Sequence, residues 1–339
     1  MPLPKRQNGE SADDFIARCM ADEVTTRDFP DSEQRFAVCR SLLNEGESAS
    51  IPETPSCWHS HLGFYAINPD WMREAVAMVK AGTIQETAPK AEIDADLQVI
   101  ESGIAVINIS GQMQKGESKF GGTSTVATRK ELRAAARSED VAEILLLIDS
   151  PGGTVAGTKE LADDIAAANA IKPVVAQFID MTASAALWVG VHAGEVFANR
   201  MAQVGSIGVF AVVEDSSGKM EREGIKVHVV STGPLKGAMV EGTEITKEHL
   251  AELQKSVDEF SEIFVESVAN GRGIDVSDVA AVADGRMMPS VEAVKVGLVD
   301  AVQSLDQTIM HMQSRINEKV RSRRQSAAVK RFAKACAES

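Results

Sequence analysis

The sequence predicts an α/β protein, because short apolar segments rich in β-branched residues alternate with helix-forming segments from residue 96 onward. Segments 104–110 (IAVINIS) and 143–149 (EILLLID) have the composition of buried strands. Between them, residues 126–137 are rich in Ala, Arg and Glu, which favour a helix. Buried strands separated by such helices predict parallel pairing through right-handed crossovers.

The composition narrows the class of protein. With 339 residues, 44% hydrophobic and 25% charged, the chain is expected to form one large or two ordinary soluble globular domains. No apolar stretch reaches the ~18 residues that span a bilayer, and the polar N-terminus lacks the apolar segment of a secretory signal. Together with only four scattered cysteines, these features predict a cytoplasmic protein without a dense disulfide framework.

The net charge of −14 divides unevenly along the chain. Residues 311–339 carry eight basic and two acidic side chains, which leaves −20 on the rest. The acidic body is a poor general nucleic-acid binder, whereas the tail suits either a solvated terminus or contact with an acidic or nucleic-acid partner. The tail, residues 306–339, is expected to begin as a helix, because apolar residues recur at helical spacing at Leu305, Ile309, Met312, Ile316 and Val320.

Residues 1–50 are expected to form a small module of two helices, with apolar residues at helical spacing in both halves of segment 11–45. Ser11 and Asp14 have the spacing of a helix cap. The two helices are too short to hold a core alone. Cys19 and Cys39 are therefore expected to pack the apolar faces together as free thiols, which behave as small hydrophobes.

Residues 51–95 are expected to form a linker with short ordered pieces, since they carry four prolines and no clear periodicity. Cys57, His59 and His61 lie within it. A zinc site needs a fourth ligand at a fixed spacing, and no such residue follows, so we interpret the three as loop residues rather than as metal ligands.

Beyond residue 150, further strands are predicted at 174–179, 206–213 and 226–231. A long helix with one apolar stripe is predicted over 246–270. Together with the first strands, these elements define an α/β domain over residues 96–305.

Two predicted strand-to-helix turns could carry chemistry. In segment 148–161, Gly152 and Gly153 would leave backbone N–H groups uncovered near a helix N-terminus, although an ordinary turn has the same pattern. In segment 179–190, Ser184 stands among alanines. Small neighbours let a carbonyl approach a nucleophilic serine, but a packed serine at a helix start is the simpler interpretation of Ser184 alone.

A nucleophilic serine needs a base. His192 lies eight residues after Ser184 on the same predicted helix, which places it roughly 12 Å along the axis and out of reach. His228 is expected in the middle of a strand, and no Ser-His-Asp arrangement or GxSxG motif is present. Lys236, in the loop STGPLKGAMVEG, is the alternative base, although taken alone it would be an ordinary surface lysine.

In combination, these segments resemble the serine-lysine peptidase family that includes signal peptide peptidase A and the head maturation proteases of tailed phages. The resemblance spans roughly residues 96–305 and six motifs carry it in the family's order: IDSPGG, TASAALWVG, VGSIGVF, STGPLKGA, FVESVANGRGI and ADGRMMPSVEAVKVGLVDAV. It implies a Clp/crotonase-type superhelix of ββα units, assembly into a homo-oligomeric ring, and catalysis without a metal or other cofactor.

Carried over residue by residue, the resemblance implies that Ser184 is the catalytic nucleophile and Lys236 the general base. The backbone N–H groups of Gly153 and Ala185 would form the oxyanion hole, with Gly152 shaping the turn.

Two further points concern the implied site. Ser206 is implied as a supporting residue that orients the Lys236 amine. The residue after the nucleophile, Ala185, is glycine in many bacterial signal peptide peptidases, and alanine there points toward the phage branch.

The flanking regions favour a phage prohead protease that cleaves scaffold, itself, and portal or capsid proteins within the assembling prohead in the host cytoplasm. No membrane anchor is expected, and segment 9–43 resembles a helical module of phage structural proteins through its RCM, FPD and AVC triplets. The basic tail would be a scaffold-related segment. Two alternatives stay open: a soluble hydrolase of the signal-peptide-peptidase type, and a catalytically inactive capsid-associated structural protein.

Overall fold

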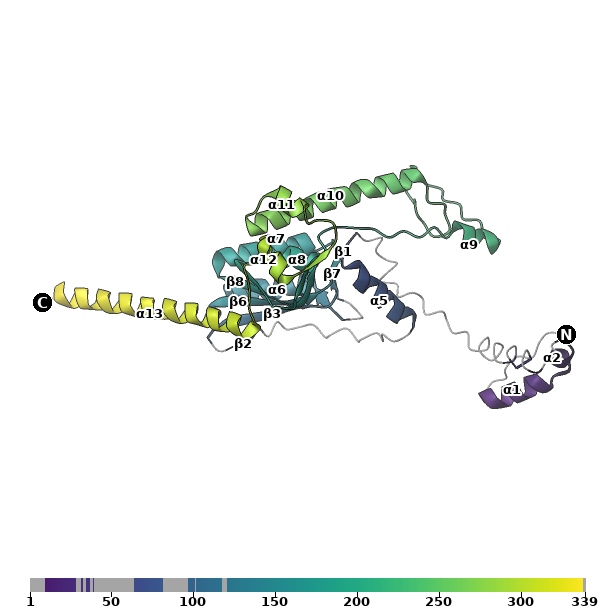
Figure 1. Ribbon diagram of the computed structural model, residues 1–339, viewed down its shortest axis with the longest axis horizontal. Coiled ribbons are helices and arrows are strands. Elements are labelled where there is room, and N and C mark those ends of the chain that lie inside the picture. The colour runs from purple at the N-terminus through teal and green to yellow at the C-terminus, as the bar shows by residue number, and fades with distance from the viewer. Residues whose placement is uncertain are drawn as a thin grey trace. The chain divides into compact units, whose positions relative to one another are not determined.

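The computed structural model describes residues 10–28, 32, 35–36, 39, 64–81, 97–100, 102–117 and 121–337. The chain divides into two compact units, Met1–His61 and Leu62–Ser339 (Figure 1). Cys57, His59 and His61 lie outside the described residues, so their prediction as loop residues is untested.

The N-terminal unit contains two short helices, α1 (Ala12–Ala21) and α2 (Glu23–Asp28). The Ser11 hydroxyl accepts a hydrogen bond from the Asp14 backbone N–H at 3.2 Å, which is the predicted cap. Phe15, Cys19 and Cys39 are fully buried together. Most of the second predicted helix lies outside the described residues.

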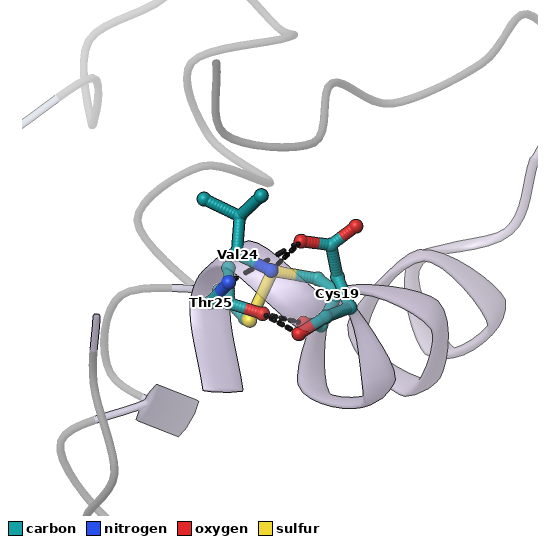
Figure 2. The surroundings of a disulfide bond; sticks show 5 residues. Cys19, Val24 and Thr25 are labelled. Carbon is teal, nitrogen blue, oxygen red and sulfur yellow. Dashed lines mark hydrogen bonds between the residues drawn. A yellow bond between two sulfur atoms is a disulfide. The ribbon is translucent and has the colours of Figure 1, made fainter. Parts of the chain in front are cut away.

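The prediction that Cys19 and Cys39 are free thiols is wrong, because the two residues form a disulfide (Figure 2). Their Cα atoms lie 5.8 Å apart, which is the ordinary separation for such a bond. The packing that was expected of the two thiols brings them to bonding distance. In a unit of this size a covalent link supplies stability that a small apolar core does not.

The second unit contains a main sheet with the strand order β11-β10-β8-β6-β3-β2. Neighbours β3 to β6, β6 to β8 and β8 to β10 pair in parallel, whereas both outer strands pair antiparallel. Strands β9 and β12 extend the sheet from β8. The strand bounds are β2 (Gln98–Ile100), β3 (Ile104–Ser110), β6 (Glu143–Ser150), β8 (Val174–Ala183), β9 (Glu195–Ala198), β10 (Gln203–Gly205), β11 (Met287–Pro289) and β12 (Ala301–Val302).

The predicted strands at 104–110, 143–149 and 174–179 are confirmed, but those at 206–213 and 226–231 are wrong. Residues 226–231 form no strand, and the only pairing within 206–213 is an isolated bridge from Phe210 to Tyr65. Both segments are rich in the apolar and β-branched residues that favour a strand, yet neither has a neighbouring strand along its length. In 226–231 the valines are partly or fully exposed, whereas in 206–213 Ile207 is fully buried in the core without belonging to a strand. The composition of the two segments therefore does not specify a sheet position.

A second, smaller sheet has the order β1-β7-β4-β5. Its strands are β1 (Tyr65–Ile67), β4 (Met113–Gln114), β5 (Thr123–Ser124) and β7 (Gly152–Thr154). Strand β1, with helix α5 (Pro69–Lys80) after it, comes from the stretch expected as a linker. It pairs with β7, which holds both glycines of the first candidate turn.

Helices cover both faces of the main sheet. On one face, α6 (Thr125–Arg137), α7 (Thr158–Ile171), α8 (Ala185–Gly190) and the C-terminal end of α10 (Lys247–Arg272) share one large apolar core with the strands. The shorter helices α9 (Ser217–Arg222), α11 (Val276–Ala280) and α12 (Ser290–Lys295) lie between the longer elements in sequence. Together these elements make a mixed α/β unit built on parallel strands, as predicted.

The opposite face of the main sheet holds α13 (Leu305–Ala337), whose Met312 and Ile316 pack on Leu145 and Val175. Arg315 donates from Nε and Nη2 to both carboxylate oxygens of Glu143, at 2.8 and 2.7 Å. Because the Glu143 side chain is only 1% exposed, this pair fixes where the helix crosses the sheet. The predicted tail helix is confirmed and continues to Ala337. No helix among the described residues is long and apolar enough to cross a membrane.

Candidate active site

Ser184 lies at the turn that joins β8 to α8, where it is fully buried. Its backbone has φ 56° and ψ −117°, a conformation that residues other than glycine rarely adopt. Neighbouring elements hold it there: the Ser184 N–H donates to the Gly205 carbonyl at 2.8 Å, and the Trp188 N–H donates to the Ser184 carbonyl at 2.8 Å. A sharp, strained strand-to-helix turn presents a serine hydroxyl clear of its own backbone, as a nucleophile requires.

The Pro-Gly-Gly turn packs directly against the Ser184 turn. Gly152 has φ 95°, and a Cβ built on it would lie 2.9 Å from the Ala185 nitrogen and 2.8 Å from the Ala183 oxygen. On Gly153, a Cβ would lie 1.7 Å from the Met113 oxygen. Both glycines are therefore required by close backbone approach rather than by turn flexibility alone. The structure thus places Gly152 against the backbone of Ala183 and Ala185, the two residues that flank Ser184 in the sequence.

Ser206 lies beside the same turn. In the parallel pairing of β10 with β8, Gly205 is the register partner of Ala183, so Ser206 follows next to Ser184. Ser206 is 3% exposed, has φ 53°, and donates its N–H to the Arg286 carbonyl at 2.7 Å. Two serines with positive φ therefore lie side by side at neighbouring strand ends.

Lys236 lies elsewhere. It is exposed, in the loop that links α9 to the start of α10, and it shares no hydrogen bond with Ser184. The Ser184 hydroxyl instead lies 3.4 Å from the Gly208 carbonyl. Residues 208–263, which we call the arm, contain no buried residue, and in Figure 1 the arm extends beyond the sheet around the label α9. The structure therefore presents the predicted nucleophile and base in very different environments.

The described histidines have other partners. His192 lies beyond the end of α8, so it is not on the nucleophile's helix as predicted. Its Nδ1 lies 2.8 Å from the Trp188 carbonyl and its Nε2 lies 3.2 Å from the Ser267 hydroxyl, and burial lowers its pKa. His249 caps α10, His311 contacts Glu195, and His228 is exposed. Within the described residues, no group of three or more His, Cys, Asp or Glu side chains could hold a metal ion.

Sequence reasoning missed the residues that shape the site from outside the two turns. The Arg286 carbonyl holds Ser206, and its side chain pairs with Asp284, both within a motif whose individual residues carried no predicted role. Strand β1 flanks the glycine turn, and its Tyr65 exchanges backbone hydrogen bonds with Phe210 at 2.8 and 3.0 Å. The short apolar run FYAI was the signal in the sequence for β1.

Comparison with known proteins identifies relatives among the proteases. The model of peptidase family S49 matches residues 166–319, a range that includes Ser184, Ser206 and Lys236. A putative protease of Synechocystis is 31% identical over 197 residues, 58% of this chain and 68% of that protein. Capsid assembly protease C of Escherichia phage lambda is 30% identical over 231 residues, 64% of this chain and 50% of that protein.

Relatives from bacteria are similarly close. Protease 4 of Salmonella typhi is 29% identical over 208 residues, which cover 61% of this chain and 33% of that protein. The chain thus spans about two thirds of the Synechocystis relative but half or less of the other two. From the family match and the Synechocystis relative together, the chain belongs to peptidase family S49.

Proposed function

We propose that this chain is a serine endopeptidase with a Ser184–Lys236 dyad that acts as a prohead protease during phage head assembly. The observation that carries the peptidase part is the buried Ser184 turn, strained at the serine and closed by two obligatory glycines. Membership of family S49 supports the same chemistry.

In the proposed reaction, Ser184 Oγ attacks a peptide carbonyl while the neutral Lys236 amine accepts the hydroxyl proton. The amine then returns that proton to the leaving nitrogen, and water activated by the same amine releases the acyl-enzyme. Gly153 and Ala185 would donate their N–H groups to the developing oxyanion, and Gly152 would hold the two turns together. Ser206, one strand away from Ser184, would orient the amine.

A lysine acts as a base only where burial favours its neutral form, and Lys236 is exposed in the single chain. The dyad therefore requires that the arm be covered by protein. Self-association into the ring that the family resemblance implies would cover it and place a lysine amine at Ser184. The superhelix of ββα units is the arrangement that we propose for the domain around this site.

The phage assignment is supported by relatives. Besides the lambda protease, head-tail preconnector protein GP5 of phage P21 is 28% identical over 233 residues. The N-terminal module with its RCM, FPD and AVC triplets adds to this support. We propose scaffold, portal and capsid proteins, and the chain itself, as substrates within the prohead in the host cytoplasm.

A second candidate function is peptide hydrolysis of the signal-peptide-peptidase type, because relatives with such names are equally close. A putative signal peptide peptidase of Enterococcus faecium is 30% identical over 173 residues. Cleavage of short apolar peptides, without cleavage of phage scaffold, portal or capsid proteins, would favour this function.

The test is co-expression of the wild-type chain with scaffold, portal and capsid proteins of a tailed phage, beside Ser184→Ala and Lys236→Ala. We expect processing in the wild type and at least about a 10³-fold loss in each variant. Lys226→Ala is the matched control, since Lys226 is also exposed on the arm, and it should process normally. Equal processing by all four chains would contradict the dyad.

Two additions separate the alternatives. A fluorophosphonate should label wild-type Ser184, and failure to label would support the inactive structural protein. Mixing Ser184→Ala with Lys236→Ala chains shows which chain supplies the amine: recovery of activity places Lys236 of one copy at Ser184 of another.

A further inference from the structure

Helix α10 carries an exposed acidic face along most of its length. Glu248, Glu252, Glu259 and Glu266 follow one another at intervals of four and seven residues, which places them on one side of the helix. All four are exposed. Between Lys247 and Gly271 the helix has six acidic and two basic residues, and its buried residues begin only at Phe264. This stretch therefore presents negative charge on a helix that is held at one end only.

The second half of α13 carries the opposite charge. From Asn317 to Ala337 the helix has seven basic residues and one acidic residue. Arg321, Arg323 and Arg324 are exposed, and none of them forms an ion pair with another described residue. Lys319, one turn earlier, still lies 4.0 Å from Glu143 of the sheet. The helix thus leaves the body at about this point and continues as a basic rod.

The two helices cannot meet within one chain. The α10 helix is anchored through Phe264 and Val268 on one face of the main sheet, and α13 through Met312 and Ile316 on the other. Their free ends leave the body in opposite directions, α10 toward the label α9 and α13 toward the C-terminus (Figure 1). Each charged surface is therefore available to a different molecule.

We propose that the basic half of α13 from one copy binds along the acidic face of α10 in a second copy. The partner surface is present at the same concentration as the tail and has the complementary charge. A nucleic acid is the weaker candidate, because the remainder of the chain carries −20 and would repel a polyanion. The contact joins two different surfaces, so repetition gives a ring where the rotation closes.

This inference rests on the self-association in the proposed function but not on cleavage. It is therefore tested in full-length chains that carry Ser184→Ala, which cannot process themselves under the proposed mechanism. The tail reversal is Arg321→Glu with Arg323→Glu and Arg324→Glu. The α10 reversal is Glu248→Lys with Glu252→Lys and Glu259→Lys. Self-association is measured by sedimentation at about 50 mM and about 500 mM NaCl, since salt screens exposed charges.

We expect the parent chain to associate in low salt, and each reversal alone to weaken association at least about tenfold. Both reversals in one chain should restore it, because the signs are again complementary. An equal mixture of the two single reversals should also associate, through the unchanged α10 of one chain and the unchanged tail of the other. Far-UV circular dichroism and thermal unfolding that match the parent would show that the variants fold.

Several outcomes would overturn the proposal: a parent chain that stays monomeric, single reversals that associate like the parent, or a double reversal that does not recover. Binding of each variant to a DNA duplex of about 20 base pairs is measured as the last comparison. If the tail reversal abolishes duplex binding while the α10 reversal leaves self-association unchanged, the tail serves nucleic acid instead.

Discussion

The Ser184 turn and the arm are opposite in burial and packing. At the turn, every residue from Thr182 to Val191 is buried and backbone atoms approach so closely that only glycine fits opposite. Across the arm, residues 208–263, no residue is buried, and Val230 is 98% exposed. Ser184, the proposed nucleophile, is held by a rigid backbone within one chain. Lys236, the proposed base, needs desolvation, and within one chain it is exposed.

The largest expected effect comes from Gly153→Ala. Its new Cβ would lie 1.7 Å from the Met113 oxygen, so the backbone of β4 or β7 must move. We expect a loss of unfolding free energy of at least about 3 kcal/mol, by the mechanism of forced backbone strain, together with loss of cleavage. Urea unfolding and fluorophosphonate labelling measure both effects.

Gly218→Ala on the arm is the matched control, since a Cβ added to Gly218 would meet no atom within 4 Å and the residue has no positive φ. Its unfolding free energy should stay within about 0.5 kcal/mol of the wild type. Equal losses in the two alanine variants would contradict the contrast between the regions.

Helix α10 contains both environments and allows a test within one element. Phe264 is fully buried and stacks on Trp188 with ring centroids 4.3 Å apart, behind the Ser184 turn. Phe264→Ala should cost about 3 kcal/mol of unfolding free energy through lost burial and the cavity left behind. Leu250→Ala, at a position 46% exposed near the other end, should cost less than about 1 kcal/mol.

A smaller effect concerns pH. Burial lowers the pKa of His192, so the unfolded chain binds a proton more readily than the folded one. Stability should then fall as the pH drops through the unfolded value of about 6.5. His192→Gln should remove that part of the pH dependence in urea unfolding. The prediction would be wrong if the wild type gained stability relative to His192→Gln as the pH falls from 7 to 5.

The smallest effect on stability is expected at the arm. Val230→Asp should leave unfolding of the isolated chain within about 0.5 kcal/mol, because the side chain is already in water. The same change should weaken self-association and cleavage if the arm is covered in the assembly, since a carboxylate would then lose its hydration. Unchanged self-association, measured by sedimentation, would place Val230 outside the interface.

The parts of the fold that could be predicted from sequence are those whose pattern and environment agree. Segments 104–110 and 143–149 are apolar on both sides because helices cover both faces of the sheet, so their strands were predictable. Segments 206–213 and 226–231 show the same residue types with no neighbouring strand along their length. A single sequence does not show whether an apolar segment pairs in a sheet, packs into the core without pairing, as Ile207 does, or lies exposed on the arm, as Val230 does.

The candidate site divides in the same way. Gly152, Gly153 and Ser184 follow the ends of neighbouring strands, an arrangement compatible with one shared site, but only the family resemblance implied that they act together. The position of Lys236 depends on the path of the arm, which has no buried contact to specify it. The disulfide was missed for a related reason, because helical spacing shows which faces meet but not how closely two sulfur atoms approach.

The attachment of α13 to the sheet determines both how far its basic half extends from the body and which way its basic face points. Between Asn317 and Ala337 the helix extends about 30 Å at the helical rise, without a flexible joint after the Arg315–Glu143 pair. Each residue turns the helix by about 100°, so the Arg315–Glu143 attachment to the sheet also fixes the direction in which the basic face points. Inserting one residue after Ile316 would rotate the basic face away from its present direction. Inserting seven residues, close to two full turns, would nearly restore that direction and would move the face about two turns farther along the helix axis.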